Sequence, residues 1–394
     1  MTSDTAGFSG LRIAILTDGV APWVMGGIQR HSRMLAVEMA RSGASVSLFH
    51  SVRDPAHQAD AETLKGFPGD VRSRIRSFVV DYPAPGRFPG HYIGDSWRYS
   101  TRLLNRYRHE GVGADFIYAQ GLTGLAFTTS RSSNSQGLPP VGVNQHGYEM
   151  FQHAADMKTS LQHMMLRGTF ARLAREADCV FAFPGRIRRI VHERCGVAND
   201  RIIEIPNAVD RSWIRSERPL PTGCRRFVFV GRHERRKGVP ELARAIQRFA
   251  PDDTEFQFVG PIPEHLQPRQ RNVVYHGPVS DACRLQGILD GCDVLVCPSF
   301  AEGMPTVVLE GMARGLAIIA TDVGATSEWV DESNGVLLAA PHVPGLYRAI
   351  RRFVDMPAAE LHTLQLTSLK KSRQYEWGRV ANVTLRAISD RVHA

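Results

Sequence analysis

The sequence has no apolar run long enough to form a helix that crosses a bilayer. The hydrophobic share of its 394 residues is 43%, which is ordinary for a globular protein. Residues 1–10 are small and polar, without the basic and then apolar regions of a secretory signal. We therefore expect a short loose N-terminal tail on a cytoplasmic protein.

Cysteine is scarce and follows no pattern. The six cysteines include no CxxC pair, and no histidine cluster lies near them at the spacing of zinc ligands. We expect free thiols in a reducing compartment and no metal site.

Several nucleotide-binding motifs are also missing. No Asp-x-Asp pair is present to hold a divalent ion on a diphosphate. The absence of GxxxxGK[ST] argues against a P-loop NTPase, and the absence of GxGxxG after either first strand weakens the case for an NAD enzyme. No metal and no cofactor are expected.

The net charge is +9 and the pI about 9.5. Nucleic acid, an anionic membrane surface or a phosphorylated substrate would each suit such a charge. The basic residues are mostly arginines and are spread out, and no nucleic-acid-binding motif is evident. Nucleic acid is therefore the weakest of the three, and we expect none.

A strand–helix–strand pattern occurs twice. In the first half, an apolar run at 11–17 precedes a helical pattern at 28–42 and a strand at 45–50, which predicts a βαβ unit in a parallel sheet. After residue 220 the pattern returns, with strands expected at 227–230, 255–259, 293–297, 317–320 and 335–338. The predicted fold class is α/β, with two Rossmann-like, doubly wound domains.

The polar stretch 211–224 carries Pro219 and Pro221 and lacks apolar periodicity, so we place the domain boundary there. Two such domains side by side imply an interdomain cleft, with ligands outside the carboxyl ends of the strands. The expected limits are 1–215, 216–375 and 376–394.

The segment 299–315 (SFAEGMPTVVLEGMARG) is the most informative. Pro305 suits a first helical turn, so the N–H groups near 304–307 form a positive helix end that favours a phosphate. Glu302 and Glu310 flank it, and each carboxylate can accept hydrogen bonds from a pair of sugar or ribose hydroxyls. The alternative is an amphipathic helix with ordinary surface glutamates, but the Gly-Met-Pro turn at a strand–helix junction favours a nucleotide-sugar site.

Two further features follow strand ends. Gly231-Arg232 and Lys237-Gly238 lie in VGRHERRKG, where the two cations can stabilise a departing diphosphate. The alternative is a solvated basic loop, since Arg235 and Arg236 lie there too. His146-Gly147 follows the apolar run 141–144. A lone histidine is more often structural, but this one is expected to face the cleft.

These residues resemble the retaining GT-B glycosyltransferases called glycosyltransferase family 4, over nearly the whole chain and most strongly from 227 to 338. The family's E-x7-E motif matches Glu302 and Glu310, and its G-R-x4-K-G motif matches Gly231, Arg232, Lys237 and Gly238. The remaining matches are Gly26-Gly27 to its glycine-rich loop, His146-Gly147 to its His-Gly pair, and 206–210 to its P-N-G-V-D signature, with Ala208 in place of glycine.

The resemblance implies a role for each matching residue. Arg232 and Lys237 would bind the donor diphosphate, Glu302 the hydroxyls of the transferred sugar and Glu310 the ribose. Sugar and phosphate would be contacted by Gly303, Met304, Pro305, Thr306 and Val307, and the diphosphate also by Gly26 and Gly27. His146 would contact the sugar near the reacting carbon, and the base would lie beside Gly277, Pro278 and Val279. The resemblance also implies that a C-terminal helix returns from Glu376-Trp377 to the first domain.

The resemblance also implies a metal-independent transfer with retention, in which the acceptor attacks from the face that the diphosphate leaves. The product would belong to bacterial polysaccharide, glycolipid or related glycoconjugate synthesis. Two alternatives stay open: a sugar-nucleotide 2-epimerase of the same fold, and a non-catalytic relative that binds a sugar nucleotide. The donor base and sugar are not encoded clearly enough to choose.

The acceptor, a sugar or a lipid-linked sugar, is expected in the first domain. Two basic stretches there suggest a protein held peripherally on the inner face of an anionic membrane, and solvated helix faces are an equal alternative. The stretches contain Arg98, Arg102, Arg106 and Arg108, then Arg167, Arg172, Arg175, Arg186, Arg188 and Arg189, with apolar Leu103, Leu104, Met164, Met165 and Phe170 between them.

Overall fold

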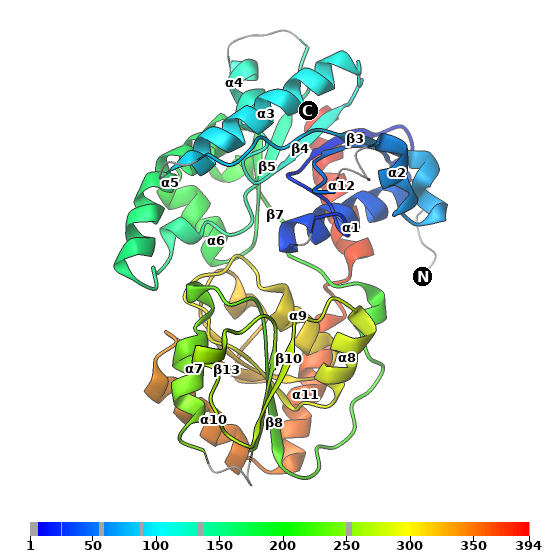
Figure 1. Cartoon of the computed structure of the whole chain (residues 1–394). Coiled ribbons are helices and arrows are strands. Elements are labelled where there is room, and N and C mark those ends of the chain that lie inside the picture. Colours follow the sequence, from blue (N-terminus) through cyan, green and yellow to red (C-terminus); the bar gives the residue numbers. More distant parts are fainter. Residues whose placement is uncertain are drawn as a thin grey trace. The chain divides into compact units, whose positions relative to one another are not determined.

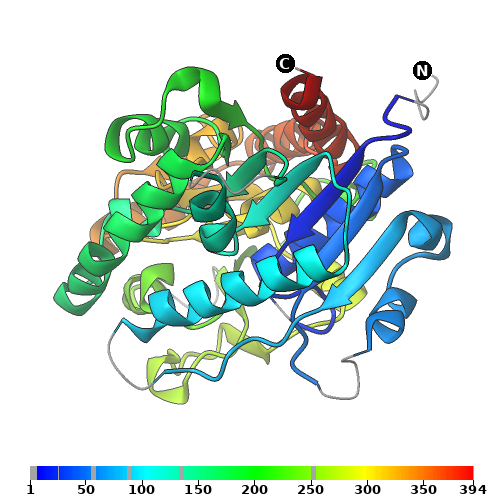
Figure 2. The ribbon, with the colours of Figure 1, turned by 90° about the horizontal axis from the view of Figure 1, so that it is seen from above.

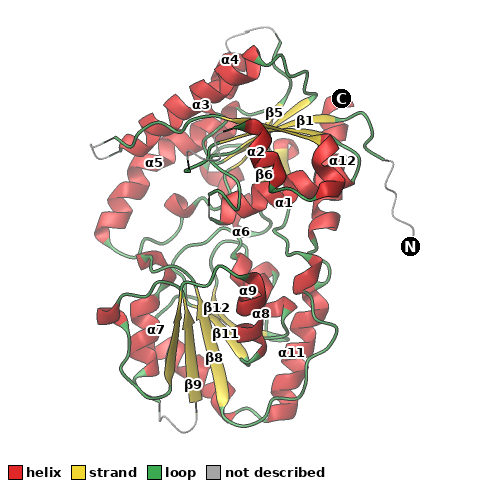
Figure 3. Ribbon diagram, turned by 45° about the vertical axis from the view of Figure 1, so that its right-hand side comes forward, coloured by secondary structure: helices red, strands yellow, loops and turns green. Residues whose placement is uncertain are grey.

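The computed structural model describes residues 7–24, 26–54, 59–86, 90–132, 137–249 and 254–393. Residues 1–6 of the expected N-terminal tail lie outside these ranges. The chain forms two compact units, each built on its own parallel sheet (Figures 1 and 3). The first comprises 1–151, 161–206 and 377–394, and the second comprises 152–160 and 207–376.

The first unit contains a seven-stranded sheet in the order β3-β2-β1-β4-β5-β6-β7. Helices cover both faces, with α12 beside α1 on one face and α3 beside α4 on the other (Figure 2). The strands are β1 (Arg12–Leu16), β2 (Ser45–His50), β3 (Ile75–Val79), β4 (Phe116–Gln120), β5 (Val141–Asn144), β6 (Cys179–Ala182) and β7 (Ile202–Glu204). The helices are α1 (Gly27–Arg41), α2 (Asp60–Lys65), α3 (His91–His109), α4 (Leu125–Ser132), α5 (Met157–Glu176), α6 (Arg186–Arg189) and α12 (Trp377–His393).

The second unit contains a six-stranded sheet in the order β10-β9-β8-β11-β12-β13. Figures 1 and 3 show α7 on one face and α8, α9 and α11 on the other, and α10 packs beside α7. The strands are β8 (Arg225–Val230), β9 (Thr254–Val259), β10 (Val273–Gly277), β11 (Val294–Cys297), β12 (Ala317–Thr321) and β13 (Gly335–Leu338). The helices are α7 (Val239–Ile246), α8 (Ala282–Asp290), α9 (Thr306–Ala313), α10 (Val343–Asp355) and α11 (Ala358–Ser372).

The central strands are mostly apolar because helices cover both faces of each sheet. Every residue of β4, β5, β11 and β12 is buried. The predicted α/β class and the two doubly wound sheets are confirmed.

Each sheet has one topological switch point, where neighbouring strands are followed by connections that run in opposite directions. In the first unit it lies between β1 and β4, and in the second between β8 and β11. Ligands of open parallel sheets bind outside the carboxyl ends of the strands at such points.

The limits of the two units differ from the expected 1–215, 216–375 and 376–394. Residues 207–215 belong to the second unit, where the Asn207 amide donates to the Met304 carbonyl (3.2 Å) and the Val209 N–H to the Tyr375 carbonyl (2.9 Å). The helix α12 belongs to the first unit and packs on α1.

The apolar residues within the two arginine-rich stretches differ in exposure. Leu103, Leu104 and Phe170 are buried in the core, whereas Met164 and Met165 are exposed. In the part of the chain that the structure describes, no helix is long and apolar enough to span a membrane.

Candidate functional site

The loop that follows β8 brings its cations back toward the sheet. Residues 235–237 form a single 3₁₀ turn that ends at Gly238, which has φ +69°. A Cβ at Gly238 would lie 1.9 Å from the carbonyl oxygen of Pro298, so the loop can pass this close to the end of β11 only with glycine.

Glu302 is the centre of this site. Its carboxylate is 7% exposed and accepts three hydrogen bonds: from the Lys237 ammonium (2.6 Å), the Arg236 guanidinium (2.8 Å) and the Ser299 hydroxyl (2.7 Å). Lys237 is also largely buried, at 16% exposure. The loops after β8 and β11 are therefore joined by a charge network at the switch point of the second sheet.

The surroundings of Glu302 keep it ionised. Burial alone would raise its pKa, but the charges of Lys237 and Arg236 and the hydrogen bonds from Lys237 and Ser299 outweigh burial and lower the pKa to about 2. A carboxylate buried without such partners would instead take up a proton.

The backbone around Glu302 is held from several sides within the second unit. The Gln152 amide donates to the Glu302 carbonyl (2.6 Å), and its oxygen accepts from the Gly324 N–H (3.0 Å). The Asn207 amide donates to the carbonyl of Met304 (3.2 Å). These bonds fix the turn that leads into α9.

The helix α9 begins at Thr306 after the N-cap residue Pro305, and no side chain caps its start. Its positive end therefore faces the loop that carries Glu302, as a phosphate site requires. Glu310 lies in the second turn and is buried, at 5% exposure, so it is not an ordinary surface glutamate of an amphipathic helix.

Other predicted residues of the second unit lie nearer its surface. Arg232 is 70% exposed and pairs with Glu234 (2.8 Å). Gly277, with Pro278 and Val279 after it, ends the edge strand β10, and its carbonyl accepts from the Gly260 N–H (2.9 Å).

The remaining predicted residues belong to the first unit. Gly26 is the N-cap of α1 and Gly27 its first residue, and a Cβ at Gly27 would meet nothing within 4 Å. His146 follows β5 in a turn with φ +62°, and Tyr148 has φ +51°. Positive φ at a residue other than glycine is costly and is concentrated at functional sites.

His146 belongs to a network of buried polar groups. Its Nε2 bonds to the amide oxygen of Gln120 (2.5 Å), and the Gln120 amide nitrogen lies 3.1 Å from Nδ1 of His31. With Gln120 in this orientation, Nε2 of His146 carries the hydrogen. Burial lowers the pKa of His146 to about 3, so the ring is neutral at neutral pH.

Sequence reasoning missed some members of these networks. Arg236 is not among the predicted site residues, yet its guanidinium bonds to Glu302 and to the carbonyl of Ala301 (3.1 Å). The only sequence signal for Arg236 was its place beside Lys237. Gln120, at the end of β4, gave no signal beyond its position at a strand end.

Two family models match the chain. The one described as glycosyl transferases group 1 matches residues 224–356, and the one described as glycosyltransferase family 4 matches residues 25–213. The chain is similar to the putative teichuronic acid biosynthesis glycosyltransferase TuaC of Bacillus subtilis, with 34% identity over 313 residues that cover 76% of this chain and 78% of the relative.

Two solved structures show the same fold. Sucrose-phosphate synthase from Thermosynechococcus elongatus has a TM-score of 0.76 and 18% identity, covering 96% of this chain and 98% of that chain. HepE from Anabaena, in complex with UDP, has a TM-score of 0.66 and 17% identity, covering 96% and 100%. At these identities the likeness concerns the fold alone.

Proposed function

The chain belongs to the group 1 and family 4 glycosyltransferases, with the GT-B fold of two Rossmann-like domains, and we propose that it is a retaining, metal-independent member. It would move a sugar from a nucleotide-diphosphate sugar to an acceptor in polysaccharide, glycolipid or related glycoconjugate synthesis. The name of the TuaC relative, which refers to teichuronic acid biosynthesis, supports this product class. HepE, of the same fold, was solved with UDP, which supports a nucleotide donor.

The observation that carries the proposal is the Lys237–Glu302 pair beside the start of α9. The donor diphosphate would lie against the N–H groups of residues 304–307, with Lys237 and Arg232 neutralising its charge. Glu310 would hold the ribose. Gly26 and Gly27 would approach the diphosphate, and Gly277 to Val279 the base.

We assign Glu302 a positioning role in addition to its expected contact with sugar hydroxyls. Its three donors already use most of the roughly four acceptor directions of a carboxylate. Its first task in the unliganded protein is therefore to hold Lys237 and Arg236 in place. Pre-organised cations need no rearrangement when charge develops on the leaving group.

In the proposed reaction the acceptor oxygen attacks the anomeric carbon from the face that the diphosphate leaves. The bond between that carbon and the phosphate oxygen breaks, and the leaving phosphate takes the acceptor's proton. Positive charge grows on the sugar and negative charge on the diphosphate, where Lys237 acts. Neutral His146 would contact the sugar near the reacting carbon without adding a charge.

A panel of UDP, GDP and ADP sugars tests the donor class through thermal stabilisation, because a ligand that binds only the folded protein raises its apparent stability. The products with an active donor are then analysed by NMR, in buffer with EDTA. We expect turnover with EDTA and a product with the anomeric configuration of the donor. Inversion, or activity restored only by a divalent ion, would contradict the proposal.

The same assay without an acceptor separates the rival functions. A 2-epimerase would convert the sugar nucleotide itself, so a new sugar nucleotide would be formed in that buffer. Binding of a donor with no turnover across a broad set of acceptors would instead indicate a non-catalytic relative.

We also propose that the protein associates peripherally with anionic membranes through α5. Met157, Leu161, Met164 and Met165 lie on one face of this helix and are between 45% and 90% exposed. Flotation with anionic liposomes tests this, with Leu161→Asp as the variant. We expect salt-sensitive binding that the variant weakens, and no binding to anionic liposomes would refute it.

A further inference from the structure

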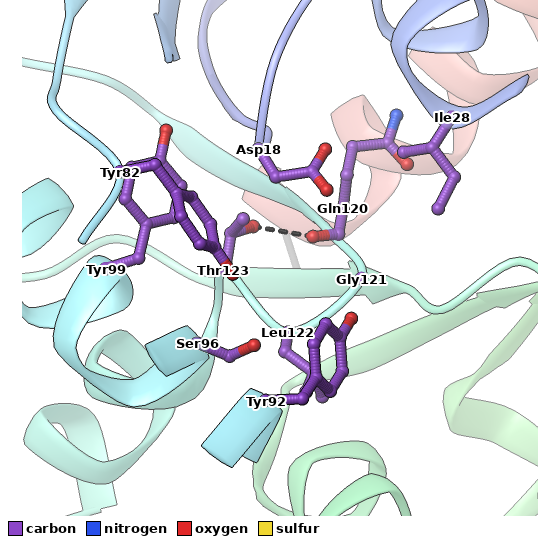
Figure 4. Close-up of a pocket in the computed structure, with 10 residues that line it drawn as sticks. All are labelled: Asp18, Ile28, Tyr82, Tyr92, Ser96, Tyr99, Gln120, Gly121, Leu122 and Thr123. Atoms are coloured by element: carbon purple, nitrogen blue, oxygen red, sulfur yellow. Dashed lines mark hydrogen bonds between the residues drawn. The ribbon is translucent and has the colours of Figure 1, made fainter. Parts of the chain in front are cut away.

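A hollow lies at the switch point of the first sheet, at the position that corresponds to the donor site of the second. It is formed by the loops after β1, β3 and β4 and by one side of α3 (Figure 4). Its enclosed volume is about 30 Å³, and about 350 Å³ when the space open to solvent is included, so a bound ring would lie partly in the open mouth of the hollow. The ten lining residues are Asp18, Ile28, Tyr82, Tyr92, Ser96, Tyr99, Gln120, Gly121, Leu122 and Thr123.

Tyrosine rings form much of its wall. The rings of Tyr82 and Tyr99 pack with centroids 4.7 Å apart, and the Tyr99 hydroxyl donates to the Thr17 carbonyl (2.9 Å). Tyr92, on the first turn of α3, is 48% exposed. Rigid aromatic walls with few polar groups are typical of pockets that bind a ring-shaped ligand.

Asp18 supplies the charged group. Figure 4 shows its side chain among the lining residues, between those of Tyr82 and Gln120 in this view. One carboxylate oxygen accepts from the Gln29 amide (2.7 Å). Burial raises the pKa of the Asp18 carboxyl, and the hydrogen bond from Gln29 opposes this. A ligand that brings a further hydrogen-bond donor, such as a hydroxyl, would therefore stabilise the ionised carboxylate, which accepts hydrogen bonds and donates none.

The surrounding charges disfavour an anion. None of the ten lining residues is Lys, Arg or His. Asp81, Asp95 and Glu149 act electrostatically on the pocket tyrosines, and the charge of Arg53 acts on Asp18. Asp95 is itself paired with His91 and Arg98. A phosphate or carboxylate placed in the hollow would face Asp18 without a cation among the lining residues.

Gln120 connects the hollow to His146. Its side chain lines the pocket, and its amide oxygen bonds to Nε2 of His146. Gln120 would therefore lie between a ring bound in the hollow and His146, which we expect near the reacting carbon.

We infer that this hollow binds the acceptor as an uncharged, hydroxyl-bearing ring, which packs on Tyr92 and donates a hydroxyl hydrogen bond to Asp18. The inference rests on the proposed function and adds the acceptor's chemical class. It excludes phosphorylated and carboxylated sugars as the ring bound here.

Saturation-transfer NMR on the full chain, with UDP, GDP or ADP present, tests the inference. The probes are glucose, galactose, N-acetylglucosamine and inositol, each compared with its monophosphate at the same millimolar concentration. We expect at least one uncharged ring to bind and to bind more tightly than its phosphate. Binding of the phosphates alone, or of no uncharged ring, would overturn the inference.

Variants locate the binding. Asp18→Asn and Tyr92→Ala should each weaken binding of the uncharged ligand by about tenfold or more, as for a lost hydrogen bond to a charged group. Tyr92→Phe, which keeps the aromatic side chain, should not weaken it. Unchanged binding in both Asp18→Asn and Tyr92→Ala would overturn the inference. Nucleotide binding to the second unit should stay unchanged in all three variants. If the unmutated protein bound no nucleotide, the proposed function would fail, whatever the result for the hollow.

Discussion

Glu302 stays ionised although it is buried, because Lys237, Arg236 and Ser299 all donate to it. Its pKa falls from 4.5 to about 2 on folding. A depressed carboxylate pKa adds stability above pH 4.5 that is lost as the pH falls toward 2. A shift of this size corresponds to about 3 kcal/mol.

Glu302→Gln should therefore lower the free energy of unfolding at pH 7 by about 3 kcal/mol, and by progressively less as the pH falls from 4.5 toward 2. Urea unfolding at a series of pH values measures this, with the exposed Glu264→Gln as the control. A loss that does not change with pH would show that the ion network contributes nothing.

Lys237 is the residue on which catalysis should depend most. Lys237→Ala should reduce sugar transfer by about two or more orders of magnitude, as expected for loss of a group that stabilises developing charge. The control Arg244→Ala removes an exposed cation from α7 of the same unit. Near-normal turnover in Lys237→Ala would remove the lysine from the mechanism.

Some individual residues of the candidate sites could be predicted from the sequence, and others could not. Glu302 and Lys237 come together as their spacing and strand-end positions indicate. Arg236 was not predicted, because only the 3₁₀ turn at 235–237 decides which of four nearby cations points inward. Gln120 was not predicted, because its partners His31 and His146 are distant in sequence.

Among the elements, the loop from β8 to α7 is the most constrained by its backbone. Gly238 combines a φ of +69° with a close approach to the Pro298 carbonyl. Gly223 in the same unit has φ +75°, but a Cβ there would meet nothing within 4 Å. An alanine at Gly223 would therefore meet only backbone strain, whereas an alanine at Gly238 would meet both backbone strain and a steric clash.

Gly223→Ala should cost about 1–2 kcal/mol, the penalty of a left-handed conformation. Gly238→Ala should cost clearly more and should also reduce transfer, because Lys237 precedes it. Urea denaturation and the transfer assay measure both effects. Equal losses of stability in the two variants would show that the contact with Pro298 is not limiting.

The strands are the elements that the sequence predicts best. β2, β5 and β13 match their expected limits, since a buried parallel strand is an uninterrupted apolar run. Leu242, Ile246 and Phe249 recur at helical spacing, yet α7 ends at Ile246. Phe249 is buried in the same core cluster after the helix has ended, so its apolar character alone does not mark the helix limit.

In the whole molecule, the buried histidines are concentrated in the first unit. Burial lowers the pKa of His146 to about 3 and that of His50 to about 4. Burial, and then the charge of His146, lower the pKa of His31 well below its ordinary value. All three are therefore neutral in the folded protein and take up protons on unfolding below about pH 6.5.

The stability of the protein should consequently fall as the pH drops from 6.5 toward 4. Each of these histidines contributes about 1.4 kcal/mol per pH unit. His50→Gln should reduce the slope of unfolding free energy against pH by the equivalent of one proton. His109→Gln, at an exposed position, should leave the slope unchanged. Denaturant titrations across this range measure the slope, and an identical slope in His50→Gln and the unmutated protein would contradict the account.

The two units and their switch points could be predicted from the apolar runs and the βαβ order. The return of 377–394 to the first unit is implied by the family resemblance and is confirmed. The boundary at residue 215 could not be predicted, since 207–215 is assigned to the second unit by contacts made far along the chain. The hollow beside Asp18 was also not predicted, because its tyrosines come from segments between strands that carry no motif.

The most direct test of the account is a crystal structure of the protein with whichever of UDP, GDP or ADP stabilises it most. We predict the diphosphate against the backbone of residues 304–307, with the Lys237 ammonium about 3 Å from a phosphate oxygen. A nucleotide bound elsewhere on the chain, with Lys237 still paired to Glu302 alone, would contradict the account.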